Sequence, residues 1–248
     1  MNGLTSAIQF LTVLRIKNES SQDTRKLGES SLYFPVVGAL LGIGLIALDK
    51  ILSLVLPPLL TNLILIFTLL IITGAMHIDG LADSCDALFS GKGKEEMLSI
   101  MREVHLGTFG ILAIVAIILF KLALLSSIPH ELRHFSLVLM ALLSRYSMSL
   151  AITFFPYARS EGKAVVFFQE KSLKNFFFST AITLIILMFS FRIMSLAILF
   201  FTIAFTFFAS FWVKSKIGGL TGDSLGALSE LNEALILLSI VVLSKVYL

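Results

Sequence analysis

The chain has 248 residues, of which 57% are hydrophobic and 14% are charged, with a formal net charge of +3. Soluble domains carry about 25% charged residues, so this composition indicates a membrane protein, and we expect a lipid bilayer and no nucleic acid as its partner. The single cysteine, Cys85, excludes an intramolecular disulfide framework, and the length favours one transmembrane domain over 1–248.

The first predicted element is an interfacial helix over 3–14. Its apolar side chains recur near helical spacing, at Leu4, Ile8, Leu11 and Leu14.

The apolar runs that follow predict the membrane spans, each of which needs about 20 residues. The candidate runs are 34–56, 59–76, 109–128, 135–155, 176–191, 193–212 and 234–247. The run 176–191 is short, and 234–247 either crosses with a tilt, stops part-way or lies in the interface. We therefore expect an all-α, polytopic membrane helix bundle with about six to seven spans besides the interfacial helix.

Basic residues predict the orientation of this bundle. Most of the 19 Lys and Arg lie on one face, in the N-terminal arm and in the segments that follow 59–76, 135–155 and 193–212. The positive-inside rule places that face and the N-terminus in the cytoplasm. We expect a multi-pass protein of the cell membrane whose active face is cytoplasmic.

An acidic motif follows the run 59–76. Asp79, Asp83 and Asp86 have the i, i+4 and i+7 spacing that lines one face of a helix. Three like charges on one face repel one another, and a divalent metal with a phosphate ligand is the ordinary solution. The alternative is a solvated helix start stabilised by the dipole, which explains Asp79 well and Asp86 poorly.

Five basic or imidazole side chains are further candidates. Arg102 and His105 have the chemistry to bind a phosphate or a hydroxyl, although a snorkelling interfacial arginine is the simpler reading. Lys121 and Arg145 lie inside predicted spans, where charged groups face the bundle interior, either in a structural salt bridge or on a substrate. Arg159 lies at a span end, where membrane anchoring is the alternative.

A glycine-rich motif precedes the last apolar run. Four glycines between 218 and 226 permit close approach of backbone N–H groups to a ligand. Asp223 adds a fourth carboxylate on the same face of the membrane, and Glu230 and Glu233 follow it. The alternative is a flexible connector, but the acidic motif elsewhere favours a second half of one site.

In this order the motifs resemble the cobalamin synthase, or adenosylcobinamide-GDP ribazoletransferase, family. The resemblance rests on Q-F-L-T at 9–12, Y-F-P-V-V-G at 33–38, D-G-L-A-D at 79–83, G-T-F-G at 107–110, P-Y-A-R at 156–159 and T-G-D-x-x-G-A at 221–227. Glu103 stands where the family usually has Asp, and Ala87 where it has Gly.

The resemblance implies a Mg²⁺-dependent phosphoryl transfer. A ribose hydroxyl of α-ribazole, or of α-ribazole 5′-phosphate, attacks the cobinamide-side phosphorus of adenosylcobinamide-GDP, and GMP leaves. We predict Asp83 and Asp223 as catalytic residues and leave open whether the protein is a homo-oligomer. The predicted metal ligands are Asp79, Asp83, Asp86 and Asp223. The predicted substrate-binding residues are Arg102, His105, Lys121, Arg145, Arg159 and Thr221.

Two other functions are compatible with parts of the pattern. A CDP-alcohol phosphotransferase motif also begins D-G-x-x-A, but there Arg follows the alanine, where this chain has Asp83, and the later G-x-x-x-D-x-x-x-D is missing. A cation-coupled transporter would place its acids mid-span, whereas Asp79, Asp83 and Asp86 lie at a span end. No internal repeat supports a transporter.

Overall fold

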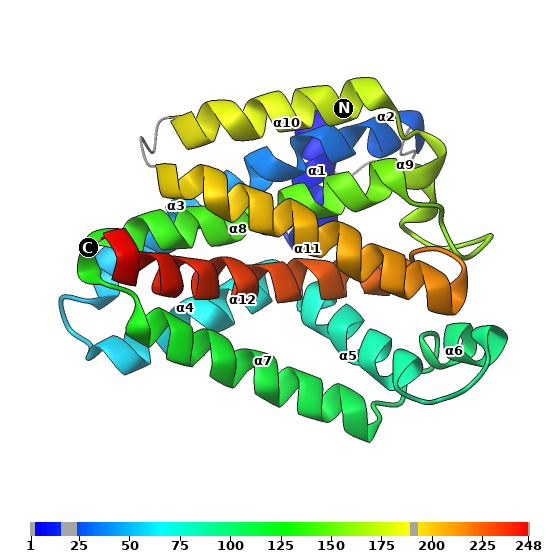
Figure 1. Cartoon of the computed structure of the whole chain (residues 1–248), viewed down its shortest axis with the longest axis horizontal. Helices are drawn as coiled ribbons and strands as arrows, with labels where there is room; N and C mark the ends of the chain where they lie inside the picture. Colours follow the sequence, from blue (N-terminus) through cyan, green and yellow to red (C-terminus); the bar gives the residue numbers. More distant parts are fainter. Residues whose placement is uncertain (1–2, 16–23, 189–192, 248) are drawn as a thin grey trace.

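The computed structural model describes residues 3–15, 24–188 and 193–247, and the regular structure in these ranges is helical (Figure 1). The elements are α1 (Gly3–Leu11), α2 (Thr24–Glu29), η1 (Ser30–Tyr33), α3 (Phe34–Leu52), α4 (Pro58–Ile72), α5 (Met76–Leu88), α6 (Lys94–Ile100), α7 (Thr108–Ser127), η2 (His130–Leu132), α8 (Arg133–Phe154), α9 (Val165–Gln169), α10 (Leu173–Met188), α11 (Ile193–Ile217) and α12 (Gly222–Tyr247). The predicted N-terminal helix is α1, which ends at Leu11.

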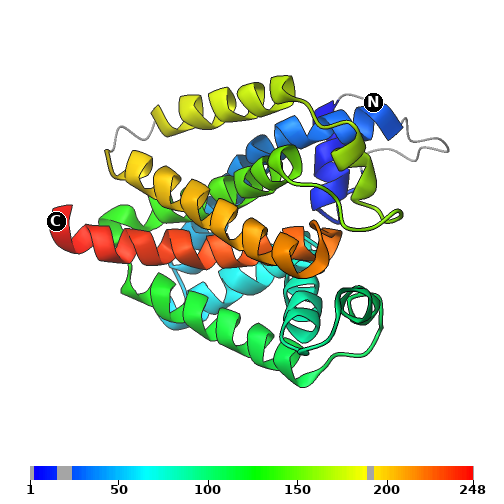
Figure 2. The same ribbon diagram turned by 45° about the vertical axis from the view of Figure 1, so that its right-hand side comes forward.

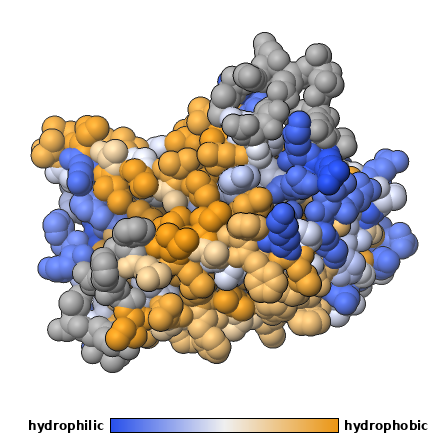
Figure 3. Space-filling model, turned by 90° about the horizontal axis from the view of Figure 1, so that it is seen from above, coloured by the Kyte–Doolittle hydropathy of each residue, from blue (hydrophilic) through white to orange (hydrophobic). Residues whose placement is uncertain are grey.

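Five helical stretches are long and apolar enough to cross a membrane. They are Arg25–Leu52, Thr108–Ser127, His130–Phe154, Ile193–Ile217 and Gly222–Lys245. An apolar band covers the middle of the molecule between two hydrophilic ends (Figure 3). The chain is therefore a multi-pass helical membrane protein.

Two of the predicted spans differ from the observed helices. α4 has only 15 residues, and α4 and α5 are long and apolar enough to cross a membrane only together, as a pair bent by 87°. α10 has 16 residues, and the end of the predicted run 176–191 lies outside the described residues. Within the described residues, five helices can span a membrane, or six if the bent pair is one span, which agrees with the lower end of the predicted six to seven.

The last span begins twelve residues before its predicted start at 234. α12 is one helix from Gly222 to Tyr247, and it includes Glu230 and Glu233. These carboxylates interrupt the apolar run in the sequence, but their side chains are almost fully buried. Partners from other helices neutralise them, so their charge does not end the span.

Close helix packing depends on small residues. α3 and α8 touch over much of their length, and Gly38 and Gly42 lie one turn apart on α3. A Cβ at Gly42 would lie 2.6 Å from Val138 Cα, and a Cβ at Gly38 would overlap the carbonyl oxygen of Ala141. Small residues at this spacing let the backbones of membrane helices approach one another.

Candidate active site

The site begins at the bend between α4 and α5. Gly74 and Ala75 have φ values of 62° and 56°, in the left-handed region that a non-glycine residue rarely adopts. The bend directs α5 toward the polar end of the bundle, where α6 packs against α5 and α11 (Figure 2). Because α5 carries three aspartates beyond the bend, we assign it to this polar end and not to the membrane spans.

The two acidic motifs meet at a helix crossing. A Cβ at Gly80 of α5 would lie 2.6 Å from the carbonyl oxygen of Asp223, and one at Gly226 of α12 would lie 3.0 Å from His77 Cα. Only glycine fits this approach of the backbones. These glycines therefore act in helix packing, and they place Asp223 beside the face that carries Asp79 and Asp83.

The carboxylates at this crossing repel one another. The pKa of Asp83 is raised from 3.8 to about 7, chiefly by burial and then by the charges of Asp79, Asp223 and Asp86, while Arg159 opposes the shift. Asp79 is exposed, and Asp83 is half-buried. A cluster whose acid is this hard to ionise lacks positive charge, which a divalent cation would supply.

Arg159 is the basic side chain closest to Asp223. Its Nη2 lies 3.1 Å from Asp223 Oδ2, and its side chain is only 9% exposed. Nη2 and Oδ2 thus engage each other, whereas Arg159 Nε makes no hydrogen bond within the described residues. Arg159 therefore keeps one unused donor, its Nε.

Backbone contacts fix the loops that carry this ion pair. The N–H of Ala158 donates to the carbonyl of Leu220, and the N–H of Leu220 donates to the carbonyl of Pro156, both at 2.8 Å. These bonds join the loop after α8 to the loop before α12.

Thr221 is engaged in the start of α12. Its Oγ1 accepts the N–H of Ser224 at 3.1 Å, and Ser224 Oγ accepts the N–H of Thr221 at 2.8 Å. This reciprocal pair is a capping box. Thr221 is fully buried, so the geometry gives it a structural role, and the predicted substrate contact receives no support from it.

Asp86, unlike the other three aspartates, accepts hydrogen bonds from the backbone at the start of α7. Its Oδ2 accepts the N–H of Gly107 at 2.7 Å, and its Oδ1 accepts the N–H of Gly110 at 2.9 Å. Any Cβ at either glycine would overlap the Asp86 carboxylate. Asp86 therefore caps the N-terminus of α7, which accounts for the G-T-F-G motif.

The predicted set of four metal ligands is not gathered in one coordination sphere. Within the described parts of the chain, no three His, Cys, Asp or Glu side chains form a group that could hold a metal ion. Both oxygens of Asp86 accept N–H groups at the start of α7 and Asp223 is paired with Arg159, whereas Asp79 and Asp83 belong to no salt bridge among the described residues. Metal binding stays a prediction, with Asp79, Asp83 and Asp223 as its candidates.

We expect Asp86→Ala to destabilise the fold and to leave the Mg²⁺ dependence of activity unchanged. Loss of a helix cap costs about 1–2 kcal/mol. Thermal unfolding in detergent should show a lower Tm, and a Mg²⁺ titration of the remaining activity should give the wild-type midpoint. A shifted midpoint with an unchanged Tm would make Asp86 a metal ligand instead.

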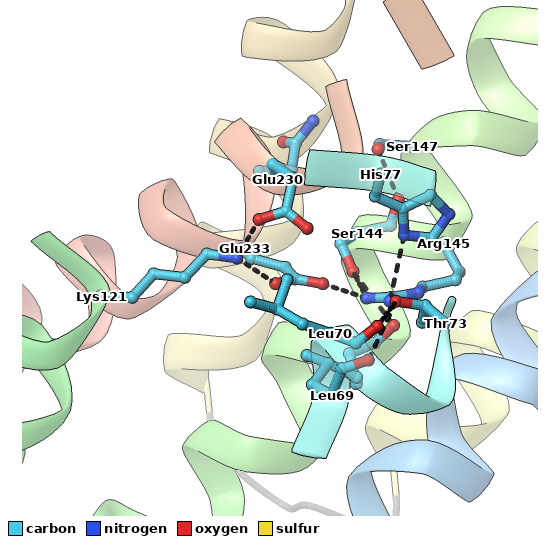
Figure 4. Close-up of polar contacts among 12 residues, drawn as sticks. Leu69, Leu70, Thr73, His77, Lys121, Ser144, Arg145, Ser147, Glu230 and Glu233 are labelled. Atoms are coloured by element: carbon cyan, nitrogen blue, oxygen red, sulfur yellow. Dashed lines mark hydrogen bonds and ion pairs between the residues drawn. The ribbon is translucent and has the colours of Figure 1, made fainter. Parts of the chain in front are cut away.

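Lys121 and Arg145 belong to a separate buried network (Figure 4). Lys121 Nζ pairs with Glu230 and Glu233, and Arg145 Nη1 pairs with Glu233. Arg145 Nη2 also lies 3.4 Å from His77 Nδ1. All five side chains are buried, so the structure provides protein partners for both basic residues and does not bring them to the carboxylates of the polar end.

Arg102 and His105 both lie on the exposed segment after α6. Arg102 lines a cavity together with Arg159, whereas His105 is not among the residues of this cavity. The structure thus places Arg102, but not His105, beside a residue of the candidate site.

Known proteins match the chain over nearly its whole length. The sequence profile of the family described as cobalamin-5-phosphate synthase matches residues 3–241. The chain belongs to this family. Adenosylcobinamide-GDP ribazoletransferase of Alkaliphilus metalliredigens is 33% identical over 98% of this chain and 96% of its own length, and that of Thermoanaerobacter pseudethanolicus is 34% identical over 97% of both. No solved structure matches the chain.

Membership in the cobalamin-5-phosphate synthase family identifies the chain as a transferase of cobalamin biosynthesis. It also decides against the CDP-alcohol phosphotransferase and the transporter.

Sequence reasoning missed the network partner His77. One signal was present, because two basic residues inside spans require acids, and Glu230 and Glu233 lie one turn apart on a helix. His77 itself gave no such signal, since its contact with Arg145 depends on how α5 packs against α8 and α12.

Proposed function

We propose that this enzyme transfers the adenosylcobinamide phosphoryl group from adenosylcobinamide-GDP to a ribose hydroxyl of α-ribazole or α-ribazole 5′-phosphate and releases GMP. The names of its relatives support these substrates. The observation that carries the proposal is the contact of Gly80 with the Asp223 backbone. This contact brings the motif of Asp79 and Asp83 next to the motif of Asp223, which is distant in sequence and is paired with Arg159.

The free carboxylates fit a magnesium ion. Mg²⁺ prefers oxygen ligands and commonly binds one or two carboxylates together with substrate phosphates. Asp83 lies among other carboxylates, and Asp223 adds a carboxylate that is paired only with Arg159 among the salt bridges of the described residues. Asp79, Asp83 and Asp223 would hold the ion, which when bound supplies charge neutralisation for the pyrophosphate.

The remaining groups orient and neutralise the reactants. The attacking hydroxyl oxygen forms a bond to the cobinamide-side phosphorus as the bond from that phosphorus to the bridging oxygen of GMP breaks. One of the carboxylates, Asp83 or Asp223, accepts the hydroxyl proton. Arg159, which is buried beside Asp223, and the nearby Arg102 stabilise the negative charge on the departing GMP.

Purified protein in liposomes tests this function directly. With adenosylcobinamide-GDP, α-ribazole and Mg²⁺, we expect equal amounts of GMP and of the cobalamin product, and α-ribazole 5′-phosphate should give the corresponding phosphate. Release of GMP without a joined product, or no turnover of either acceptor, would contradict the proposal.

The Mg²⁺ requirement should depend on pH. The pKa of Asp83 is about 7 in the absence of metal, so Asp83 is mostly protonated below pH 7 and ionised above it. Because a metal ligand must be deprotonated, the Mg²⁺ concentration for half-maximal activity should rise as the pH falls from 8 to 6. A midpoint that stays constant over this range, measured by Mg²⁺ titration of the initial rate, would argue against Asp83 as a ligand.

The polar end that carries α6 should face the cytoplasm. The positive-inside rule favours this orientation, and the C-terminus lies at the opposite end of the bundle (Figure 1). A reporter inserted after Gly93 should behave as cytoplasmic, and one fused after Leu248 should not. The reverse pattern would exclude access to cytoplasmic nucleotides from this site.

A further inference from the structure

A cavity of about 290 Å³ adjoins the candidate site, between α6 and the loop after α8. Its polar lining consists of Glu95, Ser99, Arg102, Arg159 and Ser160. Its volume is close to the lower end of the range for small-molecule sites, about 300 Å³. Arg159 provides an independent sign of a ligand, because its Nη2 is paired with Asp223 whereas its Nε, on a side chain that is only 9% exposed, has no hydrogen bond among the described residues.

The lining of the cavity carries both signs of charge, from one glutamate and two arginines. Glu95, Leu98 and Ser99 line it from α6, and Arg102 lines it from the segment that follows the end of α6 at Ile100. Glu95 lies in the first turn of α6, and Arg102 lies two residues beyond its last residue. Arg159 lines the cavity from the loop after α8, so both arginines contribute to the same lining as Glu95.

We propose that this cavity binds the GMP half of the nucleotide substrate, with phosphate at the two arginines and guanine at Glu95. The inference rests on the proposed function and adds the base-recognising residue to it. Arginine binds phosphate oxygens in a bidentate manner. A carboxylate repels phosphate, so Glu95 suits the far, donor-bearing end of the same ligand.

Guanine fits Glu95 better than the other available bases do. The N1–H and the N2 amino group of guanine are adjacent donors, and an ionised carboxylate has two acceptor oxygens. Adenine lacks this pair of donors, and the glycosylated benzimidazole of α-ribazole has no N–H. Glu95 has no ion-pair partner within the described residues, which leaves its carboxylate available to a base.

Inhibition of turnover by nucleoside monophosphates tests the assignment. The wild-type protein should be inhibited more strongly by GMP than by AMP, with IMP between them because it keeps N1–H and lacks the amino group. Glu95→Gln should lower the preference for GMP over AMP about tenfold, the effect of losing a hydrogen bond to a charged group. Glu96→Gln removes the neighbouring exposed carboxylate, which does not line the cavity, and should keep the wild-type preference.

If the wild-type protein turns over both substrates, the proposed function stands, and two results would then overturn the inference alone. One is a Glu95→Gln protein that retains the full preference for GMP. The other is an Arg102→Gln protein whose KM rises for α-ribazole 5′-phosphate but not for adenosylcobinamide-GDP, since this would place the acceptor in the cavity. Failure of the wild-type protein to release GMP would instead contradict the proposed function itself.

Discussion

Asp83→Asn is expected to lower kcat by about 100- to 1,000-fold, because it removes charge that stabilises the transition state at the pyrophosphate. The substitution keeps the size of the side chain, and it removes one of the like charges that crowd Asp79 and Asp223. The protein should therefore fold at least as well as the wild type. Initial rates at saturating Mg²⁺, together with the Tm in detergent, measure both effects.

Asp223→Asn serves as the matched variant on the other motif. If Asp223 is a ligand, the Mg²⁺ midpoint should rise as it does for Asp83→Asn; if it accepts the hydroxyl proton, kcat should fall while the midpoint stays the same. Glu96→Gln, an exposed change outside the carboxylate cluster, is the control for charge alone. A folded Asp83→Asn protein with a near-normal rate at saturating Mg²⁺ would remove Asp83 from the site.

The helical face of the acidic motif could be predicted from spacing alone, and α5 carries Asp79, Asp83 and Asp86 as expected. The different contacts that these three residues make could not be predicted from spacing. The use of Asp86 depends on two backbone N–H groups at Gly107 and Gly110. Their approach to Asp86 is a property of how α7 packs against α5, which no local pattern encodes.

The glycines show the same limit. Their presence in T-G-D-x-x-G-A predicts that another group approaches the backbone closely, which is correct. The pattern does not tell whether that group is a ligand or a neighbouring helix. Gly226 faces α5, whereas a ligand was the expected neighbour. The last span was mispredicted for a related reason, because Glu230 and Glu233 become compatible with a membrane helix only through Lys121 and Arg145, more than 80 residues away in sequence.

The buried charge network predicts the largest effect on stability. Glu233 pairs with both Lys121 and Arg145, whereas Glu230 pairs with Lys121 alone. Glu233→Gln leaves Arg145 without a carboxylate partner in the bundle interior. Breaking a buried pair from one side costs about 3–5 kcal/mol, and for a chain of this size a loss of that order lowers the Tm by roughly 10 °C.

Glu230→Gln is the matched control, because Lys121 keeps Glu233 and the loss of Tm should be clearly smaller. Adding Arg145→Met to Glu233→Gln removes the unpaired charge, so the double variant should be more stable than Glu233→Gln alone. Equal losses for the two glutamine variants, or simple additivity in the double variant, would show that the network does not act as one unit. Because His77 joins the network three residues after the bend and two residues before Asp79, a disrupted network should also loosen α5 against α12. Activity of Glu233→Gln below its unfolding transition should then fall together with its Mg²⁺ affinity, although Glu233 itself lies outside the carboxylate cluster.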